Sequence, residues 1–161
     1  MRITSTSPEM TQEVAAELAH ALRAGDLLAL SGPLGAGKTC FVQGLARGLG
    51  IKQVVSSPSF VLAKHYPGSP GLLHMDAYRL GSAEEFWELG LQEHLETSVA
   101  AVEWAENVEA ALPDQRVDIT LHDAGGETRA IEFHGVGARG TEIIAALQRD
   151  LNRHNRVETD G

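Results

Sequence analysis

The sequence predicts an α/β protein with a mixed sheet flanked by helices and an antiparallel hairpin near its C-terminal end. Short apolar runs suited to buried strands alternate with segments in which apolar residues recur at helical spacing. A glycine-rich segment, SGPLGAGKTCF at residues 31–41, joins the first of these runs to the helix after it. Near the C-terminus, two stretches alternate apolar and polar residues, as a hairpin with one exposed face does.

The first half of the chain is expected to begin with a helix. Ser7 is its predicted N-cap, Pro8 its first residue and Gly25 its stop. The apolar run at 27–30 predicts a strand buried on both faces. The segments that follow are predicted as the glycine-rich loop, a helix ending near 48–50, a loop at 54–59, a strand at 60–66, a turn at 67–71 and a short strand at 72–76.

The second half continues the alternation of helix and strand. Ser82 is the expected cap of a helix at 82–89, and Glu85 three residues later completes a capping box. The remaining predicted elements are a buried strand at 99–102, a short helix at 105–111, hairpin strands at 117–122 and 129–134 and an amphipathic helix at 141–151. We therefore expect a single domain over residues 1–152 and a polar C-terminal tail at 153–161.

Length and composition narrow the class of protein. A chain of 161 residues with 43% hydrophobic and 22% charged residues suits one globular domain. Its net charge of −9 disfavours direct binding to a nucleic-acid backbone, which needs clustered Lys and Arg. The apolar runs are too short to span a membrane, and the N-terminus lacks the apolar segment of a signal peptide. Cys40 is the single cysteine, and together these features predict a cytoplasmic protein.

Residues 32–39 match the phosphate-loop pattern G-x-x-x-x-G-K-[ST] at every fixed position. Glycines let the backbone point its N–H groups at phosphate oxygens, and the helix N-terminus that follows favours an anion. Lys38 would add a point charge at the β- and γ-phosphates, and Thr39 would offer its hydroxyl to Mg²⁺. The pattern predicts that a nucleotide binds at this loop, through Gly35, Ala36, Gly37, Lys38, Thr39 and the adjoining Cys40, but it does not give the reaction.

Two acids follow buried strands, Asp76 in LLHMD and Glu103 in VAAVEW. In an open α/β sheet the ligand lies outside the carboxyl ends of the strands, so both acids should face the phosphate loop. One of them would contact Mg²⁺ directly and the other through water, with a plain surface acid as the alternative for each. Which acid orients the attacking water stays open.

Several neighbours of these acids have two readings. Arg79 could stabilise charge on the γ-phosphate or pair with a local acid, and Trp104 is more often a core residue than a catalytic one. Ser57 and Ser59 lie where many NTPases carry a switch that senses the γ-phosphate. His74 shares a strand face with Asp76, and core packing is an equal alternative for it.

Other patterns exclude alternatives. The segment at 123–126 matches D-x-x-G but is better explained as the hairpin turn, and the chain has no N-K-x-D guanine motif, so adenine is expected. The seven His residues show no zinc pattern. Cys40 begins a helix, where a thiol pKa can be lowered, and a bound nucleotide is expected to shield it.

The ordered motifs SPEMTQEVAAELA, GPLGAGKT, SSPSF, HMDAYRL and EWAE resemble the TsaE (YjeE) family of bacterial ATPases required for the threonylcarbamoyladenosine modification of tRNA. The motifs cover about two-thirds of the chain, and their combination is more specific than the phosphate loop. The resemblance implies an ATPase with a P-loop NTPase-like fold that uses ATP and Mg²⁺. Slow hydrolysis by the chain alone is expected because no obvious arginine finger is present. It also implies the TsaB and TsaD proteins as partners, on whose complex the ATPase acts.

The same resemblance implies roles for single residues. It implies Lys38 on the phosphates, Thr39 and Glu103 on the metal, and Asp76 as essential for hydrolysis. Thr11 falls where the family's N-terminal segment approaches the nucleoside. The catalytic residues predicted in this way are Lys38, Asp76 and Glu103, and Trp104 falls on the family's tryptophan.

Three departures from the family pattern concern nucleotide affinity. Cys40 replaces a threonine, Ser59 replaces the threonine of SPTF, and Pro33 removes one backbone donor at the loop's entry. Two other functions stay open from the sequence. A small-molecule kinase could use the same loop, although no Arg-rich lid lies between Lys38 and Glu103, and a nucleotide-gated binding module would share the same residues.

Overall fold

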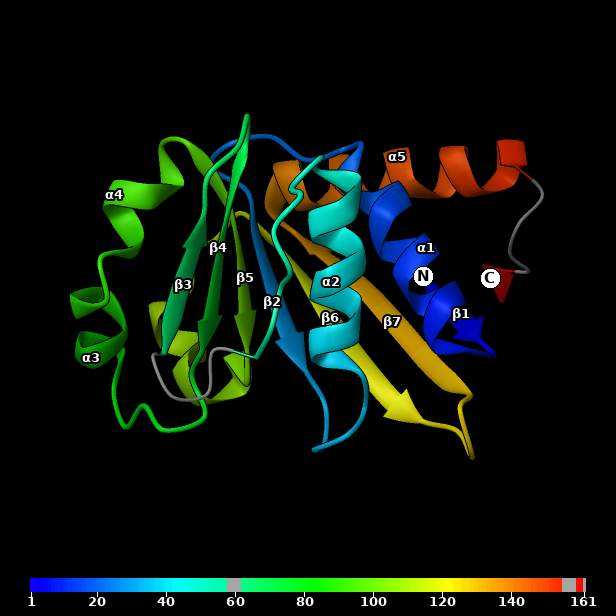
Figure 1. Cartoon of the computed structure of the whole chain (residues 1–161), viewed down its shortest axis with the longest axis horizontal. Helices are drawn as coiled ribbons and strands as arrows, with labels where there is room; N and C mark the ends of the chain where they lie inside the picture. The colour runs from blue at the N-terminus through cyan, green and yellow to red at the C-terminus, as the bar shows by residue number, and fades with distance from the viewer. Residues whose placement is uncertain (58–61, 155–158, 161) are drawn as a thin grey trace.

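The computed structural model describes residues 1–57, 62–154 and 159–160. Within them, eight strands form one sheet in the order β3-β4-β5-β2-β6-β7-β1-β8. The strands are β1 Arg2–Ser5, β2 Leu27–Ser31, β3 Ala63–Tyr66, β4 Gly71–Asp76, β5 Ser98–Glu103, β6 Arg116–Asp123, β7 Arg129–Val136 and β8 Thr159–Asp160. The helices are α1 Pro8–Ala19, α2 Lys38–Gly48, α3 Ala83–Glu88, α4 Leu91–Leu95, the 3-10 helix η1 Ala105–Ala111 and α5 Gly137–His154 (Figure 1).

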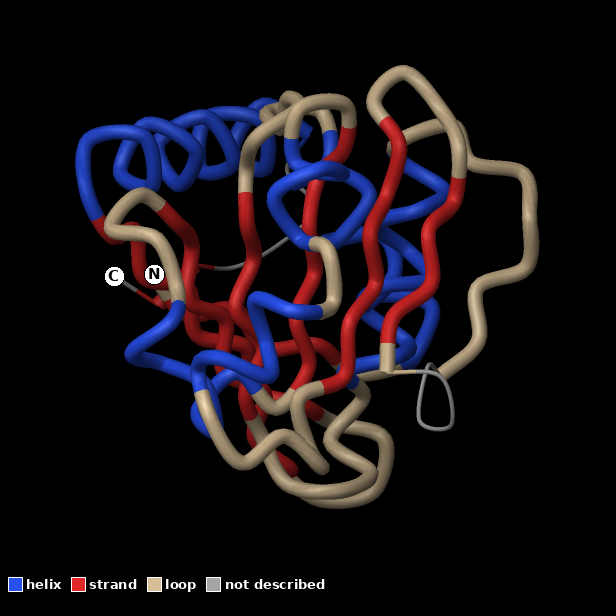
Figure 2. The backbone as a smooth tube through the Cα atoms, turned by 90° about the vertical axis from the view of Figure 1, so that its left-hand side faces the viewer, coloured by secondary structure: helices blue, strands red, loops and turns tan. Residues whose placement is uncertain are grey.

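The centre of the sheet is parallel and both sides of it are antiparallel. β4, β5, β2 and β6 run parallel to one another, whereas β3 pairs antiparallel with β4 and β7 pairs antiparallel with β6. The predicted mixed sheet with a C-terminal hairpin is therefore confirmed. Because the parallel strands share one direction, their carboxyl ends meet at one edge, the lower edge in Figures 1 and 2.

Two apolar clusters sandwich the sheet. On β2, Leu28 and Leu30 belong to a cluster with α1, α2 and α5, while Leu27 and Ala29 belong to a second cluster with α3 and η1. Successive side chains on a strand point to opposite faces, so β2 is buried on both. Figure 1 shows α1 and α2 in front of the sheet. The apolar run at 27–30 is thus the buried central strand that its composition predicted.

The cap predictions hold at two helices. Ser7 accepts a hydrogen bond from the Met10 N–H, and Ser82 accepts one from the Glu85 N–H. The Glu85 carboxylate accepts from the Gly81 N–H rather than from the N–H of Ser82, so it serves the residue before the cap. These side chains satisfy backbone donors that each first helical turn leaves unpaired.

Several elements differ from the sequence predictions. β1, β8 and α4 were not predicted, α1 ends at Ala19 rather than near Gly25, and α5 begins at Gly137. The short β1 gains its order from pairing with β7, where Ile3 lies opposite Ile131, and a four-residue segment carries little signal of its own. Of the strand predicted at 60–66, Ala63–Tyr66 is observed, and residues 60–61 lie outside the described part of the chain.

The C-terminal segment continues beyond the predicted helix. α5 extends to His154, and the backbone at Thr159–Asp160 pairs with β1 as β8. The division into one domain and a tail stays a prediction. Among the residues described, no helix is long and apolar enough to cross a membrane.

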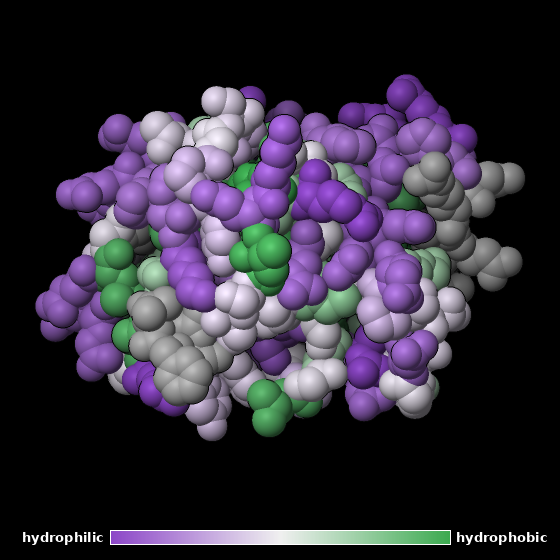
Figure 3. Space-filling view, in the orientation of Figure 1, coloured by the Kyte–Doolittle hydropathy of each residue, from purple (hydrophilic) through white to green (hydrophobic). Residues whose placement is uncertain are grey.

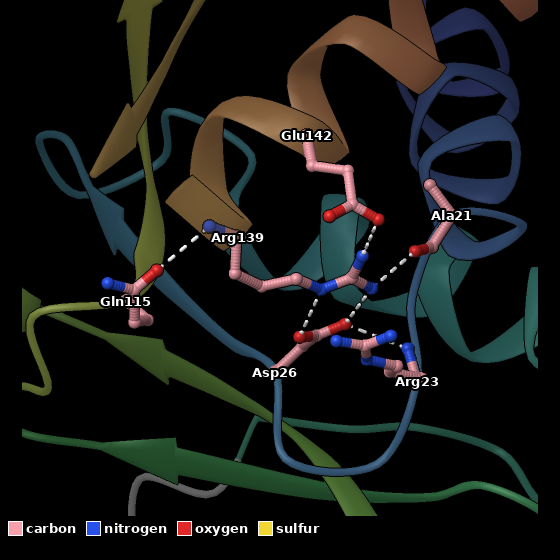
Figure 4. Close-up of polar contacts among 6 residues, drawn as sticks. All are labelled: Ala21, Arg23, Asp26, Gln115, Arg139 and Glu142. Atoms are coloured by element: carbon pink, nitrogen blue, oxygen red, sulfur yellow. Dashed lines mark hydrogen bonds and ion pairs between the residues drawn. The ribbon is translucent and has the colours of Figure 1, made fainter. Parts of the chain in front are cut away.

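A buried ion pair ties α5 to the turn between α1 and β2 (Figure 4). The guanidinium of Arg139 donates to both carboxylate oxygens of Asp26, at 2.9 and 2.7 Å, and to the carbonyl of Ala21 at 2.8 Å. Asp26 also accepts from the Arg23 N–H, and Glu142 accepts from Arg139. This arrangement, which we call the Asp26–Arg139 network, lies at the upper edge of the sheet, opposite the phosphate loop.

Candidate functional site

One cavity of about 260 Å³ opens at the carboxyl ends of β2, β4 and β5. Glu103 ends β5 and lies in register between Leu30 of β2 and Asp76 of β4. The sheet therefore places both acids beside the loop that follows β2. The cavity is lined by Leu34, Gly35, Gly37, Lys38, Thr39, Cys40, Ser57, Asp76, Glu103 and Trp104.

The phosphate loop has the backbone conformation that its glycines permit. Gly35 and Gly37 have φ of 80° and 99°, in the left-handed region that side chains with a Cβ rarely adopt. Gly37 is the N-cap of α2, so the first turn of that helix faces the cavity with its unpaired N–H groups. This is the conformation in which a helix N-terminus can bind an anion.

Lys38 is buried beside the loop that carries it. Its Nζ donates to the carbonyls of Gly32 at 2.6 Å and Pro33 at 3.0 Å, and lies 4.0 Å from the centre of the Trp104 ring. Burial lowers the pKa of Lys38, while the charges of Glu103, Glu106 and Asp76 act in the opposite direction. A positive charge held in this way is directed toward the cavity, where a phosphate group would attract it.

Thr39 and Glu103 form the second polar group of the cavity. The Thr39 hydroxyl lies 3.2 Å from both carboxylate oxygens of Glu103. His74, which is fully buried on β4, bonds to Glu103 Oε2 through Nε2. The sequence left open whether His74 packs in the core or contacts a site acid. The structure supports the contact, because the buried imidazole ring bonds to the Glu103 carboxylate.

Asp76 and Trp104 complete the lining. Asp76 is 7% exposed, and its Oδ1 accepts a hydrogen bond from the Tyr78 N–H at 2.8 Å. Trp104 has φ of 57°, an uncommon conformation for a residue with a bulky side chain. Such conformations cost about 1–3 kcal/mol and gather at functional sites. Here the left-handed turn directly after Glu103 brings the indole over Lys38 and against the ring of Tyr78.

The cavity has the oxygen donors that Mg²⁺ prefers. The Thr39 hydroxyl and the carboxylates of Glu103 and Asp76 are hard oxygen ligands, and a magnesium site needs only one or two protein ligands because the ion keeps several waters. Within the described residues, no cluster of three or more His, Cys, Asp or Glu is arranged for a metal ion. The donor set thus fits Mg²⁺ held jointly by protein, water and phosphate oxygens.

Not every predicted site residue lies in the cavity. The Thr11 side chain is buried against Ser5, with 2.7 Å between the two hydroxyl oxygens, and does not line it. The side chain of Ala36, a residue of the phosphate loop, is buried and does not line the cavity. Arg79 lines an adjoining cavity of about 280 Å³ with Leu34, Asp76, Tyr78 and Trp104. Ser57 lines the main cavity, and Ser59 lies outside the described residues.

At Cys40 the surroundings act against the lowering of a thiol pKa that a helix N-terminus can cause. Burial raises the pKa of Cys40, a hydrogen bond with Gln12 acts in the opposite direction, and Sγ lies 3.5 Å from the carbonyl oxygen of Pro8. Its place at a helix N-terminus suggested the opposite shift, but loss of solvent around the sulfur outweighs that effect. Cys40 is therefore less reactive at neutral pH than its position in the helix indicated.

Arg129 is a residue that the sequence did not point to. It donates to the carbonyls of Gly35 and Ala36 in the phosphate loop from the first residue of β7. Arg129 lies 93 positions after Ala36 in the sequence. The sequence predicted the hairpin that carries Arg129. It did not predict that this hairpin lies beside β2, next to the phosphate loop.

Known proteins resemble this chain in sequence and in structure. Residues 5–131 match the family described as threonylcarbamoyl adenosine biosynthesis protein TsaE. The TsaE protein of Bacillus subtilis is 41% identical over 95% of this chain and 94% of its own length. That of Streptomyces coelicolor is 44% identical over 80% of this chain and 92% of its own.

A solved structure supports the same assignment. The crystal structure of Bacillus subtilis YdiB superposes with a TM-score of 0.81 at 38% identity, covering 93% of this chain and 95% of that one. The fold is thus P-loop NTPase-like, as the sequence predicted. Family match, relatives and structure agree, and this chain belongs to the TsaE family of threonylcarbamoyl adenosine biosynthesis proteins.

Proposed function

We propose that this chain is a P-loop ATPase required for the threonylcarbamoyladenosine modification of tRNA, and that it acts on the TsaB–TsaD complex by binding and hydrolysing ATP with Mg²⁺. The observation that carries the proposal is that Lys38, Thr39, Asp76 and Glu103 belong to one cavity. Membership of the TsaE family supports the role in biosynthesis.

Each of these residues has a role that follows from its contacts. Lys38 would bind the β- and γ-phosphates, exchanging its bonds to loop carbonyls for charge-assisted bonds to phosphate. Thr39 and Glu103 would hold Mg²⁺, which when bound neutralises charge on the phosphate oxygens. Asp76 would be essential for hydrolysis, since Tyr78 fixes one of its oxygens and the carboxylate borders the cavity.

The proposed reaction is slow without a partner. Among the described residues, no arginine lines the main cavity, and an arginine that stabilises transferred phosphate is worth about 10³–10⁵ in rate. Two side chains at this end of the sheet are also exposed: Leu34, which lines the main cavity, is 90% exposed, and Tyr78, which lines the adjoining cavity with Arg79, is 61% exposed. Figure 3 shows small hydrophobic groups at the centre, at the left side and at the lower edge of a mainly hydrophilic face. The exposed side chains of Leu34 and Tyr78 are suited to contact with another protein.

The proposed partners also account for the charge of the chain. Its net charge of −9 disfavours a direct grip on tRNA, so contact with tRNA would be made by the complex. The proposed place of action is the cytoplasm, where a chain with a single cysteine and such partners would work.

The test is to measure ATP hydrolysis by the purified chain alone and with TsaB and TsaD. We expect slow Mg²⁺-dependent release of phosphate, increased by the partners, and its loss in Lys38→Ala. Absence of both stimulation and binding to either partner would overturn the proposed role. Transfer of labelled phosphate to a nucleoside or sugar instead of water would favour the kinase.

A further inference from the structure

We propose that Arg129 is a positioning residue that braces the phosphate loop from the hairpin between β6 and β7. This inference rests on the proposed nucleotide site for its effect on ATP binding, but not for its effect on the loop itself. The hairpin turn and the phosphate loop lie at the same edge of the sheet, the lower edge in Figure 1. Arg129 follows that turn as the first residue of β7.

One guanidinium group joins the two segments. Toward the phosphate loop, its Nε donates to the carbonyl oxygen of Ala36 and its Nη2 to that of Gly35, both at 3.2 Å. Toward the hairpin, its Nη1 donates to the carbonyl oxygens of Gly126 at 2.8 Å and Thr128 at 2.9 Å. The planar, rigid set of donors on arginine can serve these acceptors at once, whereas the single ammonium of lysine cannot reach both segments with the same geometry.

These bonds set the direction of a peptide group that matters for an anion. In a trans peptide the C=O and the N–H of the next residue point in opposite directions. Because the Ala36 carbonyl points at Arg129, the Gly37 N–H points away from β7, and Gly37 lines the cavity. Arg129 therefore holds the Gly37 N–H in a direction from which it can donate to phosphate, which lowers the ordering that binding would otherwise require.

The glycines make such a brace necessary. A Cβ built on Gly35 would meet no heavy atom within 4 Å, and Gly37 would meet only a Leu121 methyl carbon at 3.8 Å. Few atoms therefore pack against the loop at its glycines. Because glycine has the greatest backbone freedom of any residue, this part of the loop would be the most mobile without the bonds from Arg129. Among the described residues, Arg129 supplies the side-chain hydrogen bonds to the carbonyls of Gly35 and Ala36.

The experiment compares Arg129→Met and Arg129→Lys with Arg116→Met. Arg116 lies on the same hairpin, but its side chain bonds to Asp118 and to the Pro113 carbonyl and makes no contact with the loop. The first measurement is amide hydrogen exchange of residues 34–39 in the nucleotide-free protein. We expect faster exchange in both Arg129 variants and wild-type exchange in Arg116→Met, and this result does not depend on ATP binding.

The second measurement separates binding from turnover. Loss of a brace made of charged hydrogen bonds should raise the Kd and KM for ATP about tenfold or more, while kcat at saturating ATP stays within a few-fold because the acids are untouched. Lysine at 129 should bind ATP as poorly as methionine, because a charge without the fork does not hold the loop.

Two outcomes would overturn the inference. Unchanged exchange of residues 34–39 in Arg129→Met would show that the loop is ordered without the guanidinium. Wild-type ATP affinity in Arg129→Lys would show that charge alone acts there. Failure of the proposed function looks different, because the wild-type chain itself would then neither bind nor hydrolyse ATP while the exchange experiment still reports on the brace.

Discussion

The two edges of the sheet bury charged groups in opposite ways. At the upper edge, Asp26 and Arg139 satisfy each other with two hydrogen bonds, and backbone groups of Arg23 and Ala21 take up further bonding positions (Figure 4). The hydrogen bond from Arg139 to Asp26 also raises the pKa of Arg139, which favours its charged form. The charged groups of this pair therefore find hydrogen-bond partners within the protein itself.

At the lower edge the charged groups border a cavity instead of pairing with one another. Lys38, Asp76 and Glu103 are as buried as Asp26, yet they border a cavity, and Lys38 bonds to neutral carbonyls rather than to an acid. Lys38 is a buried charge whose hydrogen-bond acceptors are neutral, which is unfavourable unless something else compensates. The comparison teaches that burial of a charge does not mark function by itself. The distinguishing feature is whether the charged groups pair with one another, as at the upper edge, or border a cavity, as at the lower edge.

The largest expected effect comes from Asp76→Asn at the lower edge. The change keeps the shape of the side chain and removes its charge, so turnover should fall about 10³-fold or about 4 kcal/mol, while ATP affinity stays within a few-fold. Phosphate release and equilibrium binding measure the two quantities. Glu106→Gln is the control, since Glu106 acts on Lys38 through its charge but does not line the cavity.

The same variant separates an ATPase from a nucleotide-gated module. If Asp76→Asn abolishes turnover but supports full tRNA modification in cells, nucleotide binding alone carries the function. Turnover near the wild-type rate would remove Asp76 from the proposed site.

At the upper edge, Asp26→Asn should change stability and leave the site intact. Removing one partner of a buried ion pair is expected to lower the free energy of unfolding by about 3 kcal/mol, the lower end of the usual range. The lower end applies because the Arg139 side chain is 15% exposed. Urea unfolding measures this loss, and ATP turnover per folded molecule should stay the same.

Glu142→Gln provides the matched control for this network. Glu142 also bonds to Arg139, but its side chain is 65% exposed, so its loss should lower stability by less than about 1 kcal/mol. Equal destabilisation by the two variants would contradict the contrast between buried and exposed partners of Arg139.

Sequence patterns predicted what is local and missed what is brought together by the sheet. The phosphate loop, the cap at Ser7 and the acids after buried strands each follow from a few neighbouring residues, and the structure has the loop, the cap and both acids at their expected places. The order β5-β2-β6, which puts the hairpin on the other side of the phosphate loop from Glu103, follows from packing over long separations. Arg129 therefore could not be assigned to the loop from its own surroundings in sequence.

Cys40 and Thr11 also show that sequence patterns do not predict the surroundings of a side chain. The place of Cys40 in the chain indicated a helix N-terminus but not the packing that raises the pKa of its thiol. For Thr11, the resemblance implied a place near the nucleoside, which stays a prediction, but not the contact of its hydroxyl with that of Ser5. In both cases the direction of a side chain depends on how α1 packs against its neighbours, which periodicity does not encode.

The smallest expected effect is on the reactivity of Cys40, and it reports whether ATP occupies the lower edge. The chain has one cysteine, so modification by a thiol reagent reports on this site alone. Because burial raises its pKa, the thiolate is scarcer than in a peptide, and alkylation at pH 7 should be slower than in the urea-unfolded chain. The rate should rise about tenfold per pH unit while the thiol remains mostly protonated.

Bound ATP should slow this alkylation further, because Cys40 lines the cavity. Cys40→Ser should bind ATP within a few-fold of wild type, since the backbone N–H of residue 40, in the first turn of α2, can contact phosphate whichever side chain it carries. Alkylation that is equally fast with and without saturating ATP would place the nucleotide away from Cys40. If Asp26→Asn shows the same protection by ATP as the wild-type chain, the two edges act independently, and the charges of the upper edge serve the fold alone.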